Sequence, residues 1–221
     1  MFLFDGQSAK CGISGIILGM MTLGIDEVGR GCWAGPLVVA GVMLDDSADR
    51  YHDSKSMSAQ RRRFFAKNIQ QQHDVAMAWI EPCVIDEVGI ADSMRRGVAH
   101  VLSTLLGDSA GDNQTRIVLD GIVNYAPANY AVETLPRADA QVSAVAAASI
   151  VAKVARDQYM IDQAKQFPDY SFDAHVGYGT KAHRAALERY GMTPLHRLSF
   201  QPMKTLLAAA GGDEGWYGQH V

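Results

Sequence analysis

The stretch "LGIDEVGRGCWAGPLVVAGVML" at residues 23–44 contains two apolar runs that a glycine-rich segment separates. Runs of this length, rich in Val, Ile and Leu and bounded by turn residues, are typical of β-strands, here residues 23–28 and 37–44. Gly35 and Pro36 in the short connection favour a turn. We therefore expect the two strands to pair with each other in antiparallel orientation.

Two adjacent carboxylates, Asp26 and Glu27, lie near the end of the first run. Successive side chains on a regular strand point to opposite faces, so both can reach one site only if the strand ends or bulges there. Otherwise Glu27 acts through water or another outer contact. The segment Gly29-Arg30-Gly31 follows directly, and glycine lets another molecule's backbone approach more closely than a side chain would.

The rest of the chain alternates between helical periodicity and short apolar runs. We expect further strands at residues 75–80, 116–120 and 131–135, and helices at residues 59–71, 86–106, 142–166, 180–190 and 202–209. Strands come first, and strands then alternate with helices. This order predicts an α/β fold, with a mixed β-sheet flanked by helices and further helices at the C-terminal end.

The length and composition are those of one globular domain, with 221 residues of which 48% are hydrophobic. A net charge of −4 argues against a protein that coats nucleic acid by bulk positive charge, so any such contact must be local. The cysteines, Cys11, Cys32 and Cys83, have no CxxC spacing. This argues against a zinc site and a disulfide framework, and it indicates a reducing, cytoplasmic location.

The two ends of the chain differ from its middle. The apolar, glycine-rich N-terminal stretch is too short to span a bilayer, so we expect no membrane segment there. Met20 or Met21 is an alternative to Met1 as the natural start. We expect a flexible leader, a folded domain and a flexible tail at residues 1–21, 22–207 and 208–221.

Two more carboxylates stand at predicted element ends. Asp120 ends an apolar strand and precedes Gly121, and ligands of open α/β sheets gather at strand ends. Asp139 precedes an alanine-rich helix, where it is either an N-cap-like residue or part of a site. With Asp26 and Glu27, these residues form a candidate set of four.

Four carboxylates cannot share one small site as bare anions, because their repulsion would protonate some of them. Divalent cations remove this conflict, and oxygen ligands without His or Cys select Mg²⁺ or Mn²⁺. Two such ions about 4 Å apart can clamp the attacking and leaving oxygens of a phosphodiester. The set therefore indicates phosphoryl transfer or hydrolysis.

The letters Asp-Glu-Val-Gly occur a second time, at residues 86–89. Here they open a predicted helix, where Asp86 and Glu87 would favourably occupy the first turn. No Arg-Gly follows this copy. We interpret it as structural.

These motifs together resemble the ribonuclease HII family. The similarity rests on "GIDEVGRG", "AGPLVVAGV", "DSKSMS", "VLDG", "RADAQVSAVAAASIVAKVARD", "HVGYGTKAH" and "HRLSF", in this order over residues 23–203. The sequence departs from the family pattern at Gly89, where an Asn is common. The resemblance implies a ribonuclease H-like fold with a helical C-terminal extension, which makes residues 22–207 the catalytic domain.

The resemblance also implies an activity. The family's enzymes are endoribonucleases that hydrolyse the RNA strand of RNA–DNA hybrids and cut 5′ to single ribonucleotides in duplex DNA, leaving a 5′-phosphate and a 3′-hydroxyl. By the same match, Asp26, Glu27, Asp120 and Asp139 are the catalytic residues. They would hold two divalent ions, Mn²⁺ or Mg²⁺.

Recognition of the ribose is implied for a second group of residues. By resemblance, the backbone around Gly29, Arg30 and Gly31 and the hydroxyl of Tyr178 contact the 2′-OH, the group that distinguishes RNA from DNA. The Tyr178 ring would stack on the next sugar, which favours a deoxyribonucleotide there.

Several basic and polar residues are candidates for phosphate contact. Ser54 and Lys55 in the "DSK" segment are expected to meet a phosphate. Lys153 either pairs with Asp157, four residues later on one helix, or faces the scissile phosphate.

The tail "GGDEGWYGQHV" lacks the Gln-before-aromatics order of the sliding-clamp motif that some relatives carry, so we expect no clamp docking through it. We also expect a monomer. The sister ribonuclease HIII family shares the carboxylate set but normally carries an added N-terminal domain, for which the 22 residues before Leu23 are too few. The remaining alternatives are a non-catalytic nucleic-acid-binding module and another two-metal nuclease of this fold.

Overall fold

A computed structural model of the chain describes residues 21–45, 51, 57–107 and 115–209. The chain divides into two compact units. The first unit contains residues 1–28, 38–79 and 94–154, and the second contains residues 29–37, 80–93 and 155–221. Residues 1–20 of the expected leader (residues 1–21), the "DSK" segment and residues 210–221 of the expected tail (residues 208–221) lie outside the described residues.

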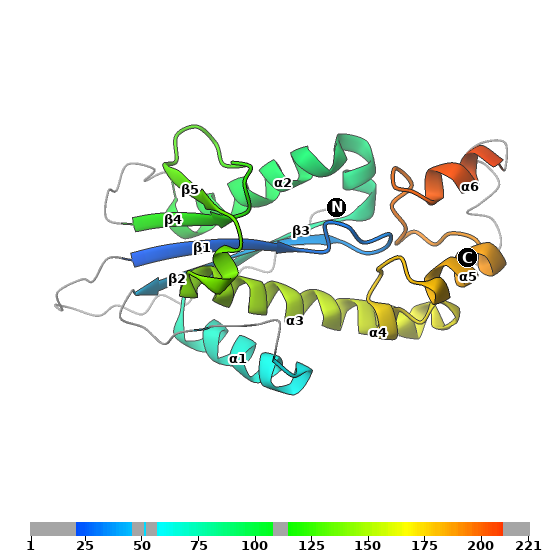
Figure 1. Ribbon diagram of the computed structural model, residues 1–221, viewed down its shortest axis with the longest axis horizontal. Helices are drawn as coiled ribbons and strands as arrows, with labels where there is room; N and C mark the ends of the chain where they lie inside the picture. The colour runs from blue at the N-terminus through cyan, green and yellow to red at the C-terminus, as the bar shows by residue number, and fades with distance from the viewer. Residues whose placement is uncertain (1–20, 46–50, 52–56, 108–114, 210–221) are drawn as a thin grey trace. The chain divides into compact units, whose positions relative to one another are not determined.

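The first unit is built on a five-stranded mixed sheet with the order β3-β2-β1-β4-β5 (Figure 1). The strands are β1 Met21–Val28, β2 Leu37–Asp45, β3 Val75–Ile80, β4 Thr115–Asp120 and β5 Val132–Leu135. β1 pairs antiparallel with β2 and parallel with β4, and β4 pairs parallel with β5. The antiparallel hairpin predicted from the glycine-rich connection is confirmed.

The helices confirm the predicted α/β class. Their bounds are α1 Ala59–Gln72, α2 Pro82–Leu106, α3 Ser143–Gln166, α4 Phe172–His175, α5 Lys181–Tyr190 and α6 Met203–Ala209, with short 3-10 helices η1 Ala138–Ala140 and η2 Pro168–Tyr170. Within the described residues, none of them has the length and apolar character needed to cross a membrane.

Helices cover both faces of the sheet in the first unit. α1 and the first half of α3 lie on one face, where their buried side chains form a core with β2 (Figure 1). The later turns of α2 cover the other face. They pack closely against it, since a Cβ built on Gly41 of β2 would collide with Val101 of that helix. Central strands covered on both faces need continuous apolar runs, which β2 and β4 have.

The alanine-rich start of α3 touches the sheet backbone itself. A Cβ built on Gly24 of β1 would collide with the backbone carbonyl carbon of Ala144. The small side chains of the helix, and the absence of a side chain at Gly24 of the strand, therefore allow this close approach. The contact holds α3 against the strand that carries Asp26 and Glu27.

We predict that Gly24→Ala lowers the free energy of unfolding by about 1–3 kcal/mol, because the helix must move away to admit a methyl group. Gly31→Ala is the matched control for stability, since a Cβ there meets no atom within 4 Å. Urea unfolding of both variants measures the difference. An equal stability of the two variants would show that α3 does not press on β1.

The start of α2 differs from the prediction. The helix begins at Pro82 rather than at residue 86, because proline fits the first helical position, where no N–H is needed. Asp86 therefore lies beyond the first turn, and the expected dipole role is wrong. Its carboxylate instead accepts hydrogen bonds from the N–H groups of Leu198 and Ser199, each at 2.8 Å, and from the Ser199 hydroxyl at 2.6 Å. This copy of the motif is structural, as predicted.

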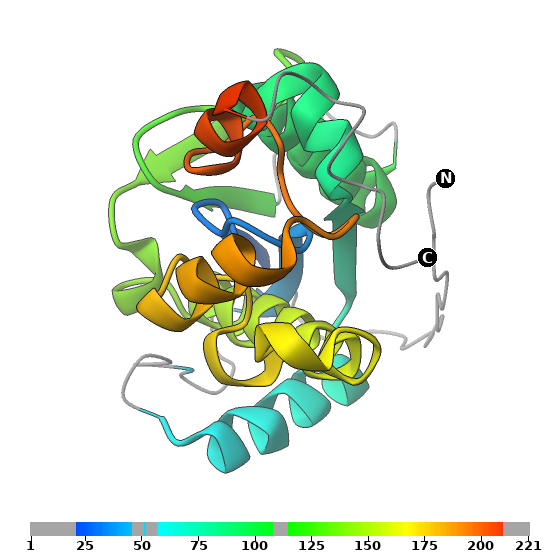
Figure 2. The ribbon, with the colours of Figure 1, turned by 90° about the vertical axis from the view of Figure 1, so that its right-hand side faces the viewer.

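The second unit is mainly helical, and Figure 2 looks onto its helices α4 and α5. One of its buried clusters surrounds Phe172, Tyr170 and Met160, and another surrounds Leu187 and Met203. These clusters show how the C-terminal helices form a packed body rather than loose appendages.

Candidate active site

Asp120 ends β4, and Asp26 lies close to the carboxyl end of its parallel neighbour β1, which continues to Val28. β1 and β4 pair up to Ile25 and Leu119, and each aspartate follows directly. Their charges interact, as do those of Asp26 and Glu27. The predicted placement of Asp120 at the end of its strand is therefore confirmed.

Asp26 occupies a strongly unfavourable place for a negative charge. The side chain is buried, and burial raises the pKa of this carboxyl to about 8, with the charges of Glu27 and Asp120 acting in the same direction. A hydrogen bond with Ser149 and one at 2.8 Å from the N–H of Glu27 oppose the shift. Without a cation nearby, Asp26 is neutral at neutral pH.

Asp120 is tied to the segment that carries Asp139. The Asp120 carboxylate accepts a hydrogen bond from the N–H of Ala138 at 2.7 Å. Asp139 is the next residue, buried in η1, and α3 begins only at Ser143. Asp139 therefore lies before the first turn of α3 and has an interaction partner, and both interpretations of it stay open.

Glu27 lies within a regular strand. The ladder between β1 and β2 is unbroken through the pairs Asp26–Ala40, Glu27–Val39 and Val28–Val38, so β1 does not bulge there. Regular alternation directs the side chains of Asp26 and Glu27 to opposite faces. This geometry favours the alternative in which Glu27 acts through water or an outer contact.

The donor set fits hard divalent ions, although the side chains are not gathered around one point. Within the described part of the chain, no three His, Cys, Asp or Glu side chains form a group that could hold a metal ion as they stand. The carboxylates of Asp26 and Asp120 nevertheless repel each other. A divalent cation relieves that repulsion, and oxygen-only donors are what Mg²⁺ and Mn²⁺ prefer.

The metal-free protein should show this electrostatic cost as a pH dependence. An unfolded aspartate ionises near pH 4, whereas folded Asp26 ionises at about 8. Between these values the folded state keeps a proton that the unfolded state has lost, so the free energy of unfolding falls as the pH rises. We predict that Asp26→Asn, which cannot ionise, is more stable than the wild type at pH 8 by on the order of a few kcal/mol.

Chemical unfolding in EDTA at pH 4 and pH 8 tests this, and the two proteins should be equally stable at pH 4. Asp162→Asn, at an exposed position of α3, is the control and should match the wild type at both pH values. An asparagine variant that is less stable at pH 8 would contradict the account of Asp26.

The segment of residues 29–37, here called the glycine turn, belongs to the second unit. Gly29 has a positive φ of 86°, and a Cβ there would collide with Nε of Arg156. The guanidinium of Arg197 donates to the carbonyl of Arg30 at 3.0 Å and to that of Gly35 at 2.8 and 3.0 Å. Gly31 is exposed and unobstructed. Arginine side chains thus hold the buried side of the turn in place, while its outer side at Gly31 is open to solvent.

The segment of residues 175–180, here called the tyrosine loop, is joined to the glycine turn. The carbonyl of Gly177 accepts hydrogen bonds from the N–H groups of Trp33 and Ala34, at 2.9 and 3.2 Å. Gly179 has no room for a Cβ because the Trp33 ring lies against it. The two segments for which the family resemblance implies contact with the ribose are therefore brought together in one unit, although they lie about 145 residues apart.

Tyr178 presents its side chain at the surface of the second unit. The residue is 42% exposed, and burial of the remainder raises the pKa of its hydroxyl, which stays protonated at neutral pH. The Arg156 guanidinium lies 6.0 Å from its ring centroid. A protonated phenol can donate as well as accept a hydrogen bond, as contact with a hydroxyl requires.

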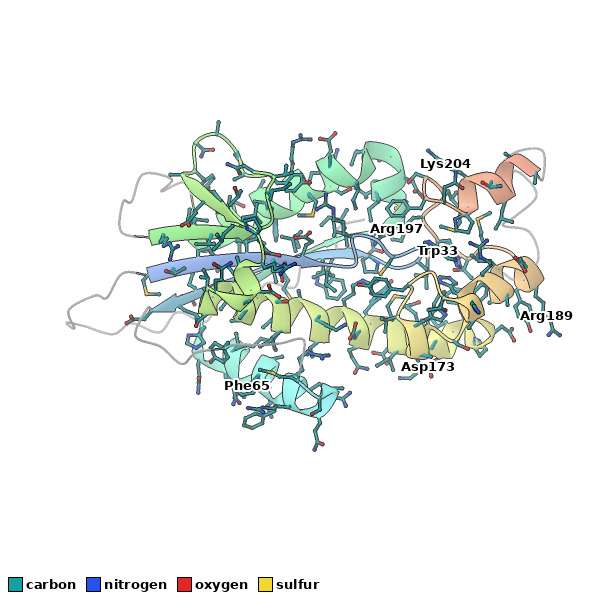
Figure 3. All side chains as sticks on the ribbon, in the orientation of Figure 1. Trp33, Phe65, Asp173, Arg189, Arg197 and Lys204 are labelled. Atoms are coloured by element: carbon teal, nitrogen blue, oxygen red, sulfur yellow. The ribbon has the colours of Figure 1, made fainter. Side chains whose placement is uncertain are left out.

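Sequence reasoning missed the buried residues that support these segments. Arg156 is fully buried and donates to the carbonyls of Pro36 at 2.9 Å, Ala34 at 3.0 Å and Val176 at 2.8 Å. The backbone N–H of Arg197, labelled beside Trp33 in Figure 3, also donates to the Trp33 carbonyl at 2.9 Å. Their partners are backbone carbonyls of distant segments, so local sequence patterns hold no signal for them.

The phosphate-contact candidates stay predictions. Ser54 and Lys55 lie outside the described residues. Lys153 and Asp157 both lie in α3 and both have interaction partners, so the two interpretations of Lys153 stay open.

Comparison with known proteins shows similarity to one enzyme family over most of the chain. The model of the ribonuclease HII family matches residues 23–203. Ribonuclease HII of Halalkalibacterium halodurans is 38% identical over 191 residues, covering 84% of this chain and 69% of its own length. That of Dichelobacter nodosus is 40% identical over 191 residues, covering 85% and 97%.

Solved structures agree on the fold. The ribonuclease HII in the PCNA complex from Archaeoglobus fulgidus has a TM-score of 0.68 and 25% identity, covering 82% of this chain and 95% of its own. Bst-RNase HIII in complex with Mn²⁺ has a TM-score of 0.65 and 21% identity, covering 88% and 72%. The fold is thus that of ribonuclease H. Because the family model and the relatives span most of the chain, this protein belongs to the ribonuclease HII family and is a hydrolytic endonuclease for RNA–DNA hybrids.

Proposed function

We propose that this ribonuclease cuts on the 5′ side of ribonucleotides, including single ones in duplex DNA, and leaves a 5′-phosphate and a 3′-hydroxyl. The observation that carries the proposal is the meeting of the glycine turn and the tyrosine loop in one unit, through the hydrogen bonds of Gly177 to Trp33 and Ala34. A surface of this kind can recognise the 2′-OH of a single ribose and does not require a long stretch of hybrid.

Asp26, Glu27, Asp120 and Asp139 hold two divalent ions in this proposal. Its support is the oxygen-only donor set, the mutual repulsion around Asp26, and the tie between Asp120 and the segment of Asp139. The Mn²⁺ complex of a ribonuclease HIII with the same fold adds support for divalent ions, with Mn²⁺ and Mg²⁺ both suitable. When bound, the ions lower the pKa of the attacking water and stabilise the leaving 3′ oxygen.

The chain's own residues bind and orient the substrate. The exposed backbone at Gly31 and the hydroxyl of Tyr178 would hydrogen-bond the 2′-OH, and the Tyr178 ring would stack on the following sugar. Arg156 and Arg197 hold the glycine turn from its buried side, so the donors stay in place when the substrate arrives. Lys55 would add a phosphate contact.

The proposal is tested with three labelled duplexes, one with a single ribonucleotide in DNA, one a continuous RNA–DNA hybrid and one all DNA, each with Mg²⁺ or Mn²⁺. We expect one cut 5′ to the single ribonucleotide, cuts along the hybrid and none in DNA, with end analysis giving 5′-phosphate and 3′-hydroxyl. Cutting of the hybrid alone would contradict the roles of Gly31 and Tyr178. Binding without cutting would favour a non-catalytic module, and cutting of all-DNA duplex would favour another two-metal nuclease.

Two partner expectations stay predictions. The family member from Archaeoglobus fulgidus was solved in complex with PCNA. The tail that we expect to lack a clamp motif lies outside the described residues of this chain. We propose that the enzyme acts on its nucleic acid as a monomer.

A further inference from the structure

Three histidines from separate segments meet inside the second unit. His175 ends α4, His183 lies in α5, and His196 follows Thr193 in the segment after α5. All three are buried. The rings of His175 and His183 stack with centroids 4.5 Å apart, and the Nε2 atoms of His183 and His196 are 3.0 Å apart.

The hydrogen-bond partners determine which ring nitrogen carries each proton. Nδ1 of His183 lies 2.9 Å from the carbonyl of Tyr178, and a carbonyl can only accept, so this Nδ1 is protonated. Nδ1 of His196 accepts from the N–H of Thr193 at 2.9 Å, so it is unprotonated. A neutral His196 then has its proton on Nε2 and donates it to Nε2 of His183.

Charge and burial support two neutral rings. Burial lowers the pKa of His183 to about 4 and that of His196 to about 3. The neighbouring His175 uses both of its nitrogens, with Nε2 donating to the carbonyl of Tyr170 at 2.7 Å and Nδ1 accepting from the N–H of Gly177 at 3.2 Å. Each nitrogen of the cluster thus has one role.

We propose that Thr193, His196 and His183 form a positioning relay that fixes the backbone of Tyr178 and so controls incision at single ribonucleotides. The relay rests on the proposed role of Tyr178 and extends it to residues that do not touch the substrate. If the proton of His183 moved to Nε2, a lone pair would face the Tyr178 carbonyl, and the loop would lose this hydrogen bond. The N–H of Thr180, which also donates to that carbonyl at 2.9 Å, would remain as a donor.

Two substitutions at one position separate the relay from general stability. In His196→Gln the amide nitrogen takes the place of Nε2 and can still donate to His183. In His196→Asn the amide oxygen takes the place of Nδ1, so the bond from Thr193 is kept and the donor to His183 is lost. His196→Asn loses the contact with His183, whereas His196→Gln loses the contacts that the N–H and the hydroxyl of Thr193 make with Nδ1, so thermal unfolding is recorded for both.

The readout is the ratio of kcat/KM for the single-ribonucleotide duplex to kcat/KM for the continuous hybrid. We expect His196→Gln to keep the wild-type ratio within about twofold and His196→Asn to lower it about tenfold, the scale of a small misplacement of a binding group. Equal ratios in the two variants would overturn the relay. A wild type that leaves single ribonucleotides uncut would instead overturn the proposed function itself.

Nitrogen-15 NMR of histidine-labelled wild-type protein tests the relay without any substitution. We expect a protonated Nδ1 and an unprotonated Nε2 for His183, and the reverse for His196. A protonated Nε2 on His183 would overturn the relay whatever the kinetics show.

Discussion

Replacing Asp120 with asparagine is expected to lower the rate of hybrid cleavage by on the order of 10³-fold, since a lost metal ligand removes several kcal/mol of transition-state stabilisation. Asparagine keeps an oxygen that can accept the hydrogen bond from Ala138, so the local fold should persist. Cleavage rates under single-turnover conditions, with thermal unfolding beside them, measure the effect.

Asp162→Asn is the matched control for this variant. It removes the carboxylate of an exposed residue that pairs with Lys165, and we expect wild-type cleavage. Hybrid binding should survive in both variants, because the glycine turn and the tyrosine loop are unchanged. An Asp120→Asn protein that cleaves at the wild-type rate would show that this strand end is not where the chemistry occurs.

The second large effect is expected from Arg156→Met, which should lower the free energy of unfolding by about 3 kcal/mol or more. The guanidinium is fully buried and donates to three backbone carbonyls. Methionine cannot donate, so each of these carbonyls loses a hydrogen bond in the variant. Urea unfolding measures the loss. Arg156→Lys should recover little of it, because a single ammonium cannot reproduce the planar fork.

Arg189→Met is the control for Arg156→Met, since Arg189 is exposed on α5 and lies over the ring of Tyr190. We expect a change within about 0.5 kcal/mol for it. If the Arg156 variant is as stable as this control, the glycine turn and the tyrosine loop are held by something other than the buried guanidinium.

The sheet could be predicted from the sequence because its signals are local. β1 and β2 are two apolar runs joined by Gly35 and Pro36, and β4 is a short apolar run that ends in Asp120. The start of α2 was mispredicted because acidic residues at 86 and 87 suggested a first turn, whereas Pro82 begins the helix. A helix boundary depends on tertiary contacts, and here the carboxylate of Asp86 serves Leu198 and Ser199.

Some residues of the candidate site could likewise be predicted from the sequence, and others could not. Asp26 and Asp120 could be placed together because strand ends converge along one edge of a parallel pair. Arg156 could not be placed from the sequence, because its partners include backbone groups far away in the chain. The contact between His183 and His196 was missed because it joins two side chains that only the fold brings together, although His183 also contacts the nearby Tyr178 carbonyl. A charged residue in a helix and a histidine in a loop look like surface residues until the fold encloses them.

The most direct test is anomalous diffraction at the manganese edge from crystals of the wild-type protein grown with Mn²⁺ and a cleaved, nicked duplex. The product keeps the 5′-phosphate and 3′-hydroxyl ends and cannot react again. We expect two manganese peaks, with the carboxylates of Asp26, Asp120 and Asp139 within coordination distance and Glu27 in contact directly or through water. Peaks elsewhere, or none at these residues, would contradict the assignment of the four carboxylates to catalysis.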